Sequence, residues 1–225
     1  MKMNVKKILG SAAAIFISIP ALFANNERGI DLYRAGLYEA AKYFFLEQTG
    51  QSPKSQAENY YYLGQVYKDL EKADSAAYYY AKAIEAEANY PFGYIGEGSL
   101  ALMSGKMSEA EELFKKAEGM NKKDASVSVA IAEAYIEVKQ YPKAQQSIEK
   151  AKKADKKYAG TFMAEGDLFK AKEENLGLAA GNYESALRLN KKEKSAYLKL
   201  EKLYEQENPK VALYYLDQMI ANEPE

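Results

Sequence analysis

Residues 60–83 read YYYLGQVYKDLEKADSAAYYYAKA, and this stretch decides the fold. Its apolar side chains recur at intervals of three and four, as at Leu63, Val66 and Tyr67, which is the spacing of one face of an α-helix. A polar segment follows, and then a second apolar series that contains Tyr80. The stretch shows no convincing alternation of apolar and polar residues, which would indicate a β-strand. It therefore predicts two helices joined by a short turn.

The same pattern returns about every 34 residues along the chain. One alanine of the second helix recurs at Ala41, Ala76, Ala110, Ala144, Ala179 and Ala212. Four residues after each of these comes a bulky side chain, at Phe45, Tyr80, Phe114, Ile148, Tyr183 and Leu216. A small residue marks the first helix of the first five units, at Gly29, Gly64, Gly98, Ala132 and Gly166. Such a period indicates one repeated unit that buries its apolar face against neighbouring copies.

This pattern resembles the tetratricopeptide repeat, a helix-turn-helix unit of about 34 residues. The second unit matches the repeat at Tyr60, Leu63, Gly64, Tyr67, Ala76, Tyr80 and Ala83. The resemblance implies an all-α fold, a right-handed α-solenoid of antiparallel helix pairs with about twelve helices. We expect units at about 25–55, 57–90, 91–124, 125–158, 159–192 and 194–225, the first of them closed by Pro53.

The first 24 residues differ from the rest of the chain. Three lysines precede an apolar run over residues 8–19, and the small Ala24 then offers a cleavage position. The alternative, an uncleaved membrane anchor, needs about 20 apolar residues, and this run is shorter. We therefore expect a signal peptide over 1–24 and a mature solenoid over 25–225 with no integral membrane segment. The protein should be periplasmic or secreted.

Composition argues against catalysis. Histidine and cysteine are both absent, which removes the commonest general base, the thiol nucleophile and the soft metal ligands. The glycines are dispersed and form no phosphate-binding loop. We expect no enzymatic activity, no catalytic residue, no cofactor and no metal site. Without the leader the chain carries 28 basic and 32 acidic residues, so it has no excess of positive charge for nucleic acid.

The family resemblance also implies a site, because the first helices of tetratricopeptide repeats line a concave groove that binds peptides. The inner positions of this sequence are then Tyr61, Gln65, Lys68, Ile95, Ser99, Leu102, Val129, Glu133, Ile136, Met163, Asp167 and Lys170. One row of these positions is apolar, namely Tyr61, Ile95, Val129 and Met163. The next row is polar to acidic, namely Gln65, Ser99, Glu133 and Asp167. Such a surface suits an extended or helical peptide with apolar anchors and basic flanks. The alternative is that the apolar row packs against a second copy or another part of the chain.

The last helix raises a separate question. Leu213, Leu216 and Ile220 should leave an apolar side uncovered, because no capping helix follows in this sequence. This face would dock a partner or a second copy of the chain, or it would pack against a continuation of the natural chain.

These observations lead to one expected function and two alternatives. We expect an exported, non-enzymatic scaffold that binds a protein or peptide in its groove and helps to assemble or tether a complex of the cell envelope. The first alternative is a glycan-binding accessory protein that uses exposed tyrosines, of which the chain has 20 in all. The second is a structural homo-oligomer joined through the last repeat.

Overall fold

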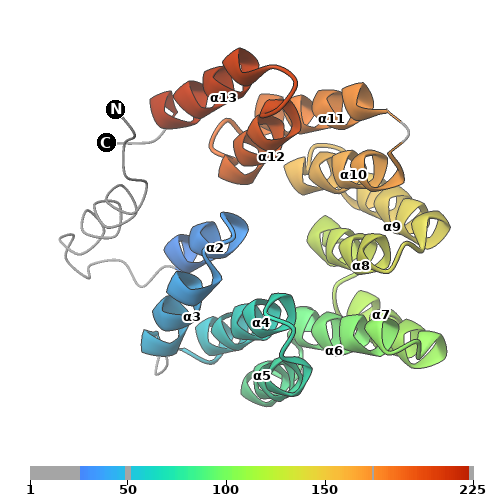
Figure 1. Cartoon of the computed structure of the whole chain (residues 1–225). Coiled ribbons are helices and arrows are strands. Elements are labelled where there is room, and N and C mark those ends of the chain that lie inside the picture. Colours follow the sequence, from blue (N-terminus) through green and yellow to red (C-terminus); the bar gives the residue numbers. More distant parts are fainter. Residues whose placement is uncertain (1–25, 49–51, 174, 223–225) are drawn as a thin grey trace.

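The computed structural model describes residues 26–48, 52–173 and 175–222, and in these residues the chain forms twelve α-helices and no strand. The predicted all-α fold is therefore confirmed. The helices, labelled as in Figure 1, are α2 (Glu27–Arg34), α3 (Tyr38–Glu47), α4 (Pro53–Asp69), α5 (Ala73–Ala86), α6 (Pro91–Met103), α7 (Met107–Met120), α8 (Ala125–Glu137), α9 (Tyr141–Ala154), α10 (Ala159–Lys172), α11 (Leu176–Leu189), α12 (Lys194–Tyr204) and α13 (Pro209–Ala221). The expected signal peptide, residues 1–24, lies outside the described residues.

Consecutive helices pack in pairs, and successive pairs stack to form an α-solenoid that curves round on itself (Figure 1). The boundary between the first two pairs differs from the prediction. Pro53 does not close the first unit but is the first residue of α4, where its missing N–H costs no hydrogen bond. The side chain of Ser52 caps this helix by accepting a hydrogen bond of 3.4 Å from the backbone N–H of Ser55.

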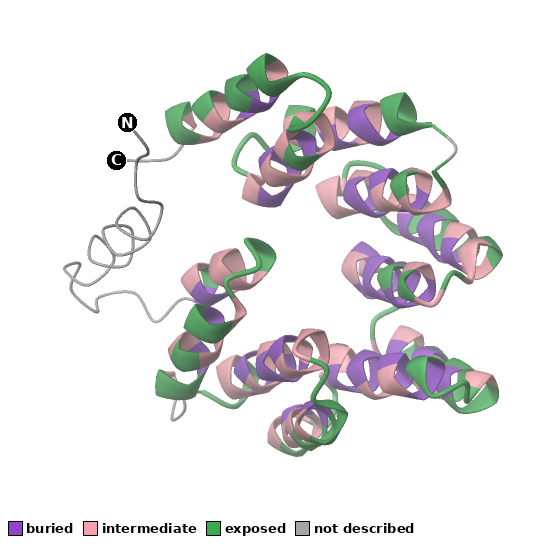
Figure 2. Cartoon of the chain, in the orientation of Figure 1, coloured by how far each residue is buried: buried purple, intermediate pink, exposed green. Residues whose placement is uncertain are grey.

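The close crossing within a pair is made by the repeated small residue. A Cβ added at Gly64 would meet the ring of Tyr80 at 2.4 Å, and one added at Gly98 would meet the ring of Phe114 at 2.5 Å. Both rings are almost fully buried, with exposed fractions of 0% and 3%. The small residue of the first helix and the bulky residue of the second helix thus form one packing unit. Figure 2 shows the buried residues on the sides of the helices that face one another.

The turn inside each of the first five pairs has a common geometry. The backbone is left-handed at Gly36 and Gly105, and also at Glu71, Lys139 and Glu173, which occupy the matching place in their units. Glycine reaches this conformation without strain, whereas the other three residues do so at a cost of roughly 1 kcal/mol each. The turn is therefore set by the repeat and not by the residue that occupies it.

The two ends of the solenoid meet. The short helix α2 contacts α12, so the helices form a closed ring in Figure 1. Two ion pairs join them: Asp31 Oδ2 lies 3.0 Å from Lys194 Nζ, and Glu193 Oε1 lies 3.3 Å from an Arg34 guanidinium nitrogen. Asp31 and Arg34 are one helical turn apart on α2, so both face the adjacent residues 193 and 194.

Helix α13 keeps one apolar side in solvent. Leu213 and Ile220 are 60% and 67% exposed, and Leu216 is half-buried. The neighbouring Tyr214 is also exposed. These residues lie on the last helix, which packs against α12.

Candidate functional site

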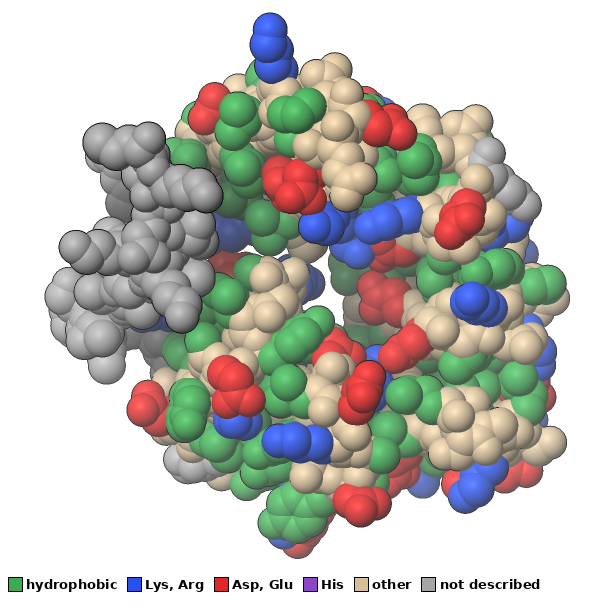
Figure 3. All heavy atoms as spheres, in the orientation of Figure 1, with side chains coloured by type: hydrophobic (Ala, Val, Ile, Leu, Met, Phe, Trp, Pro, Cys, Tyr) green, Lys and Arg blue, Asp and Glu red, His purple; other side chains and the backbone are tan. Residues whose placement is uncertain are grey.

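The ring encloses a cavity of about 670 Å³. Its wall is built from α2 and from the first helices of the later pairs, α4, α6, α8, α10 and α12, because the first helix of each pair takes the inner side of the curve. Figure 3 shows the cavity from one face as an opening at the centre of the molecule, with basic and acidic side chains around it. An inner surface made from several repeats is the place where a solenoid binds its ligands.

Eight of the twelve predicted groove residues line this cavity. They are Tyr61, Gln65, Lys68, Ser99, Val129, Glu133, Met163 and Asp167. The other four lie elsewhere. Ile95 and Leu102 are buried in the hydrophobic core, Ile136 packs against that core, and Lys170 is exposed on α10 away from the cavity.

Helix α6 explains why Ile95 and Leu102 are not on the cavity surface. Glycine at position 96 allows the ring of Tyr80 to approach α6 so closely that an added Cβ would lie 2.3 Å from it. Helix α6 is also packed against α4, α5, α7 and α8. Enclosed on these sides, it presents little apolar surface to the cavity.

The two predicted rows contribute unequally to the cavity. In the apolar row, Tyr61, Val129 and Met163 are each only 6–7% exposed, so they form the floor beneath the surface. In the polar row Ser99 is only 4% exposed, but Gln65 and Asp167 are half-buried and Glu133 is exposed to the cavity. Glu133 and Asp167 are acidic. The surface that a ligand would meet is therefore more polar than the sequence pattern indicated.

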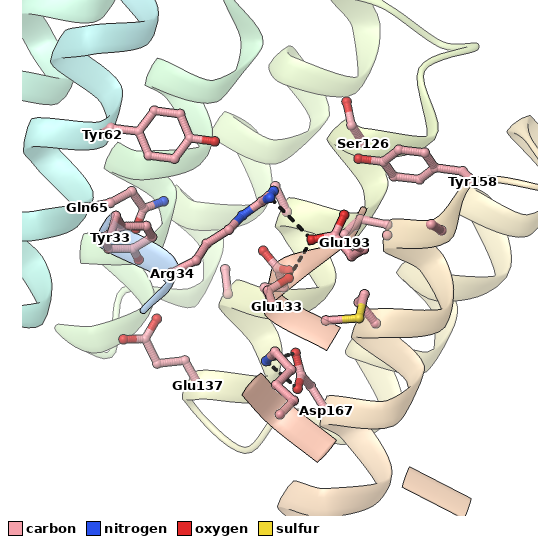
Figure 4. A pocket seen from close by; sticks show the side chains of 18 of the residues that line it. Tyr33, Arg34, Tyr62, Gln65, Ser126, Glu133, Glu137, Tyr158, Asp167 and Glu193 are labelled. Carbon is pink, nitrogen blue, oxygen red and sulfur yellow. Dashed lines mark hydrogen bonds and ion pairs between the residues drawn. The ribbon is translucent and has the colours of Figure 1, made fainter. Parts of the chain in front are cut away.

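Among the described residues, ion pairs cross or line the cavity and engage three of its four basic residues, all but Lys157. Lys68 Nζ on α4 lies 2.6 Å from Glu137 Oε2 at the end of α8. Lys199 Nζ on α12 donates hydrogen bonds of 2.6 and 2.8 Å to the two carboxylate oxygens of Asp167 on α10. Arg34 points into the cavity toward Glu193, as Figure 4 shows. Three cations of the wall are therefore each paired with a carboxylate.

Glu133 is the exception among the cavity carboxylates. It projects from α8 into the space between α2 and α10 and forms no hydrogen bond or ion pair with any residue that the structure describes (Figure 4). Glu133 is exposed to the water of the cavity, but the protein around the cavity limits its hydration, and this is the main reason why its pKa is raised; the charge of Asp167 is the second. The more distant charges of Lys199, Arg34 and Lys68 act in the opposite direction. Glu133 is thus an unpaired acid in contact with the water of the cavity.

Tyrosines supply the aromatic part of the wall. Tyr62 from α4 and Tyr158, which precedes α10, both line the cavity, and the charge of Glu133 contributes to raising the pKa of each. Burial raises the pKa of each phenol to about 12, so both remain protonated and neutral at ordinary pH. Tyr33 on α2 donates a hydrogen bond of 2.9 Å to Asp69 Oδ2.

Many residues of the site were not predicted from the sequence, among them Arg34, Tyr62, Tyr158, Glu193 and Lys199. Arg34 and Glu193 reach the cavity only because the two ends of the solenoid meet. Tyr62 is adjacent to Tyr61, for which the sequence favoured ligand contact, yet Tyr61 is almost fully buried and Tyr62 is half-buried. The signal in the sequence was the run of three consecutive tyrosines at 60–62, because consecutive residues of a helix point in different directions and cannot all face the core.

No group of three or more potential ligands in the described residues could hold a metal ion. No helix among those residues is long and apolar enough to cross a membrane. The side chains of the cavity wall include charged groups, hydroxyl groups and aromatic rings.

Together the helix pairs and the inner cavity define a class, the repeat scaffolds that present a binding surface along the inside of a curved array. A family model described as tetratricopeptide repeat matches residues 101–166, so this part of the chain is similar to the repeat that the sequence pattern resembles. The fold of this family generally serves protein interaction without catalysis.

Solved structures share the fold at low sequence identity. A thermophilic TPR protein from Thermus thermophilus is 20% identical, with a TM-score of 0.57, over 80% of this chain and 96% of that one. Yeast Tom70 is 19% identical, with a TM-score of 0.55, over 83% of this chain and 40% of its own length. A search of curated protein sequences finds no match.

Proposed function

We propose that this protein is an exported, non-enzymatic scaffold that binds an extended segment of a partner protein in the central cavity. By holding this segment it would help to assemble or tether a complex of the cell envelope. The observation that carries the proposal is the cavity of about 670 Å³, whose wall combines paired charges, an unpaired carboxylate and tyrosine rings from several repeats.

The size and chemistry of the cavity support a peptide ligand. Its volume lies within the range of roughly 300–1,000 Å³ that is usual for ligand sites. Polar side chains from three repeats reach the cavity at Gln65, Glu133 and Asp167, whereas Ser99 is almost fully buried. A chain segment that crosses the ring would meet Gln65, Glu133 and Asp167. The buried residues beneath them fix the wall, so little conformational freedom is lost on binding.

The export part of the proposal rests on residues 1–24, with their lysines, apolar run and small residue at position 24. Expression of the full chain in a Gram-negative host, followed by fractionation and mass spectrometry, tests it. The expected result is a periplasmic protein whose N-terminus lies near residue 25. An intact chain in the cytoplasm would contradict export.

A cavity variant tests the binding site. Glu133→Arg reverses one charge inside the cavity and fills part of its volume, whereas Glu112→Arg reverses a charge on the exposed outer side of α7. Cross-linking of the native protein in envelopes, followed by capture, should retain a partner that the first variant loses and the second keeps. Circular dichroism must show that both variants are folded. If both variants retain the same partners as the native chain, binding does not use the cavity.

A further inference from the structure

We propose that the bound segment places a lysine or arginine side chain in the cavity, where Glu133 is its charge partner. This inference rests on the proposed function, since it names the kind of residue that the same cavity selects. It rests on the geometry of the cavity and on the pairing of its charges.

Glu133 offers a position for a cation in the wall, because it is the wall carboxylate with neither a hydrogen bond nor an ion pair among the described residues. Lys68, Lys199 and Arg34 already have carboxylate partners, at 2.6, 2.6 and 3.3 Å. Glu133 has none among the described residues. An incoming ammonium or guanidinium group can therefore pair with Glu133 without breaking an existing ion pair. An incoming carboxylate at this position would instead be repelled by Glu133 and Asp167, since the charge of Asp167 already raises the pKa of Glu133.

The surroundings of Glu133 suit a basic side chain in a second way. The rings of Tyr62 and Tyr158 line the same cavity, close enough to Glu133 for the charge of Glu133 to raise their pKa. Aromatic faces attract cations, and the flat guanidinium group of arginine stacks on them. Such a site binds the charge through the carboxylate and the aliphatic stem through the rings.

Arg34 shows that the space accepts a guanidinium group. It enters the cavity from the last turn of α2 and donates a hydrogen bond to Glu193 (Figure 4). The field of Glu133 also acts on Arg34 and raises its pKa, although the two form no ion pair. The protein thus places one arginine of its own beside Glu133 and leaves the carboxylate free for another.

The test is selection from a phage-displayed library of random linear peptides, with the mature protein as bait. Glu133→Gln is the variant, because it removes the charge and keeps the shape. Glu112→Gln, on the exposed side of α7, is the matched control. The native protein and the control should select peptides with lysine or arginine at one recurring position. Glu133→Gln should lose this preference, and its affinity for a selected peptide should fall about tenfold, since a charged partner is lost.

The outcomes separate the inference from the function on which it rests. If the native protein selects peptides with no basic preference, or if Glu133→Gln keeps the same preference, the inference is overturned and peptide binding stands. If the native protein selects no peptides above background, both fail. Retention of the preference in Glu112→Gln and its loss in Glu133→Gln would establish the role of Glu133.

Discussion

Reversal of the two charges on α2 should open the ring. The variant is Asp31→Lys with Arg34→Glu, which places like charges opposite Glu193 and Lys194. In the native structure these pairs have N–O distances of 3.0 and 3.3 Å, and their side chains are 15–45% exposed. Exposed pairs of this kind contribute about 0.5 kcal/mol each, so the two together contribute about 1 kcal/mol to closure.

The reversal removes this attraction and adds a repulsion of similar size. The difference is therefore about 2 kcal/mol, which lowers the ratio of closed to open molecules by about thirtyfold. Salt should have part of the same effect on the native protein, because about 1 M salt shortens the screening length to about 3 Å.

Distances between spin labels at Ala35→Cys and Lys192→Cys measure the opening. The native chain has no cysteine, so labels attach only at these two exposed positions. A longer distance should appear in the double variant. The short distance should return when Glu193→Arg and Lys194→Glu are added. A distribution that is the same in all three proteins and does not respond to salt would refute the role of the ion pairs.

Three further predictions concern stability. Tyr80→Phe removes a buried hydroxyl that has no partner among the described residues, so the free energy of unfolding should rise by about 1 kcal/mol. Tyr183→Phe, at the matching position of its repeat, removes a hydrogen bond to the carboxylate of Asp167 and should lower the free energy of unfolding by about 1.5 kcal/mol or more. Gly98→Ala should cost about 1–3 kcal/mol because the added methyl group meets an aromatic ring, while Gly181→Ala, with open space around it in a helix, should gain about 0.5–1 kcal/mol. Urea denaturation checks both pairs, and equal effects within a pair would contradict the packing argument. The raised pKa of Glu133 means that the native state favours its neutral form, so its charge destabilises the fold as pH rises above the unfolded pKa. Glu133→Gln should therefore raise Tm at about pH 7 but not at about pH 3, and an equal gain at both would argue against an unpaired charge.

The sequence was a good guide to the fold because each repeat records its own packing. Gly64 and Tyr80 are 16 residues apart, and the same pair recurs at Gly98 and Phe114. One such pair would be weak evidence for a packing contact, but its recurrence in several units is strong evidence. The error was local. Pro53 suits both the close of one helix pair and the first position of the next helix, and only the cap formed by Ser52 decides between them.

The site was harder to predict because it depends on how the repeats curve. The inner positions were predicted from their place within the unit. Of the charged residues among them, Lys68, Glu133 and Asp167 face the cavity, whereas Lys170 does not. Ile95 occupies one of these inner positions but is covered, because glycines bring α6 close to its neighbours. Arg34 and Glu193 are 159 residues apart, and their contact depends on the sum of every angle between successive pairs. No single repeat contains that information.

The contact between α2 and α12 also affects how the protein unfolds. In an open array the two terminal repeats have one neighbour each, and they fray before the middle does. Here each terminal unit touches the other, so fraying of either end removes a contact from both. Hydrogen exchange at the two ends should then be coupled, and amides of α2 should lose protection when α12 is destabilised. If the contact between α2 and α12 were lost, the two ends would fray independently of each other. The cavity would then lack the part of its wall that α2 supplies.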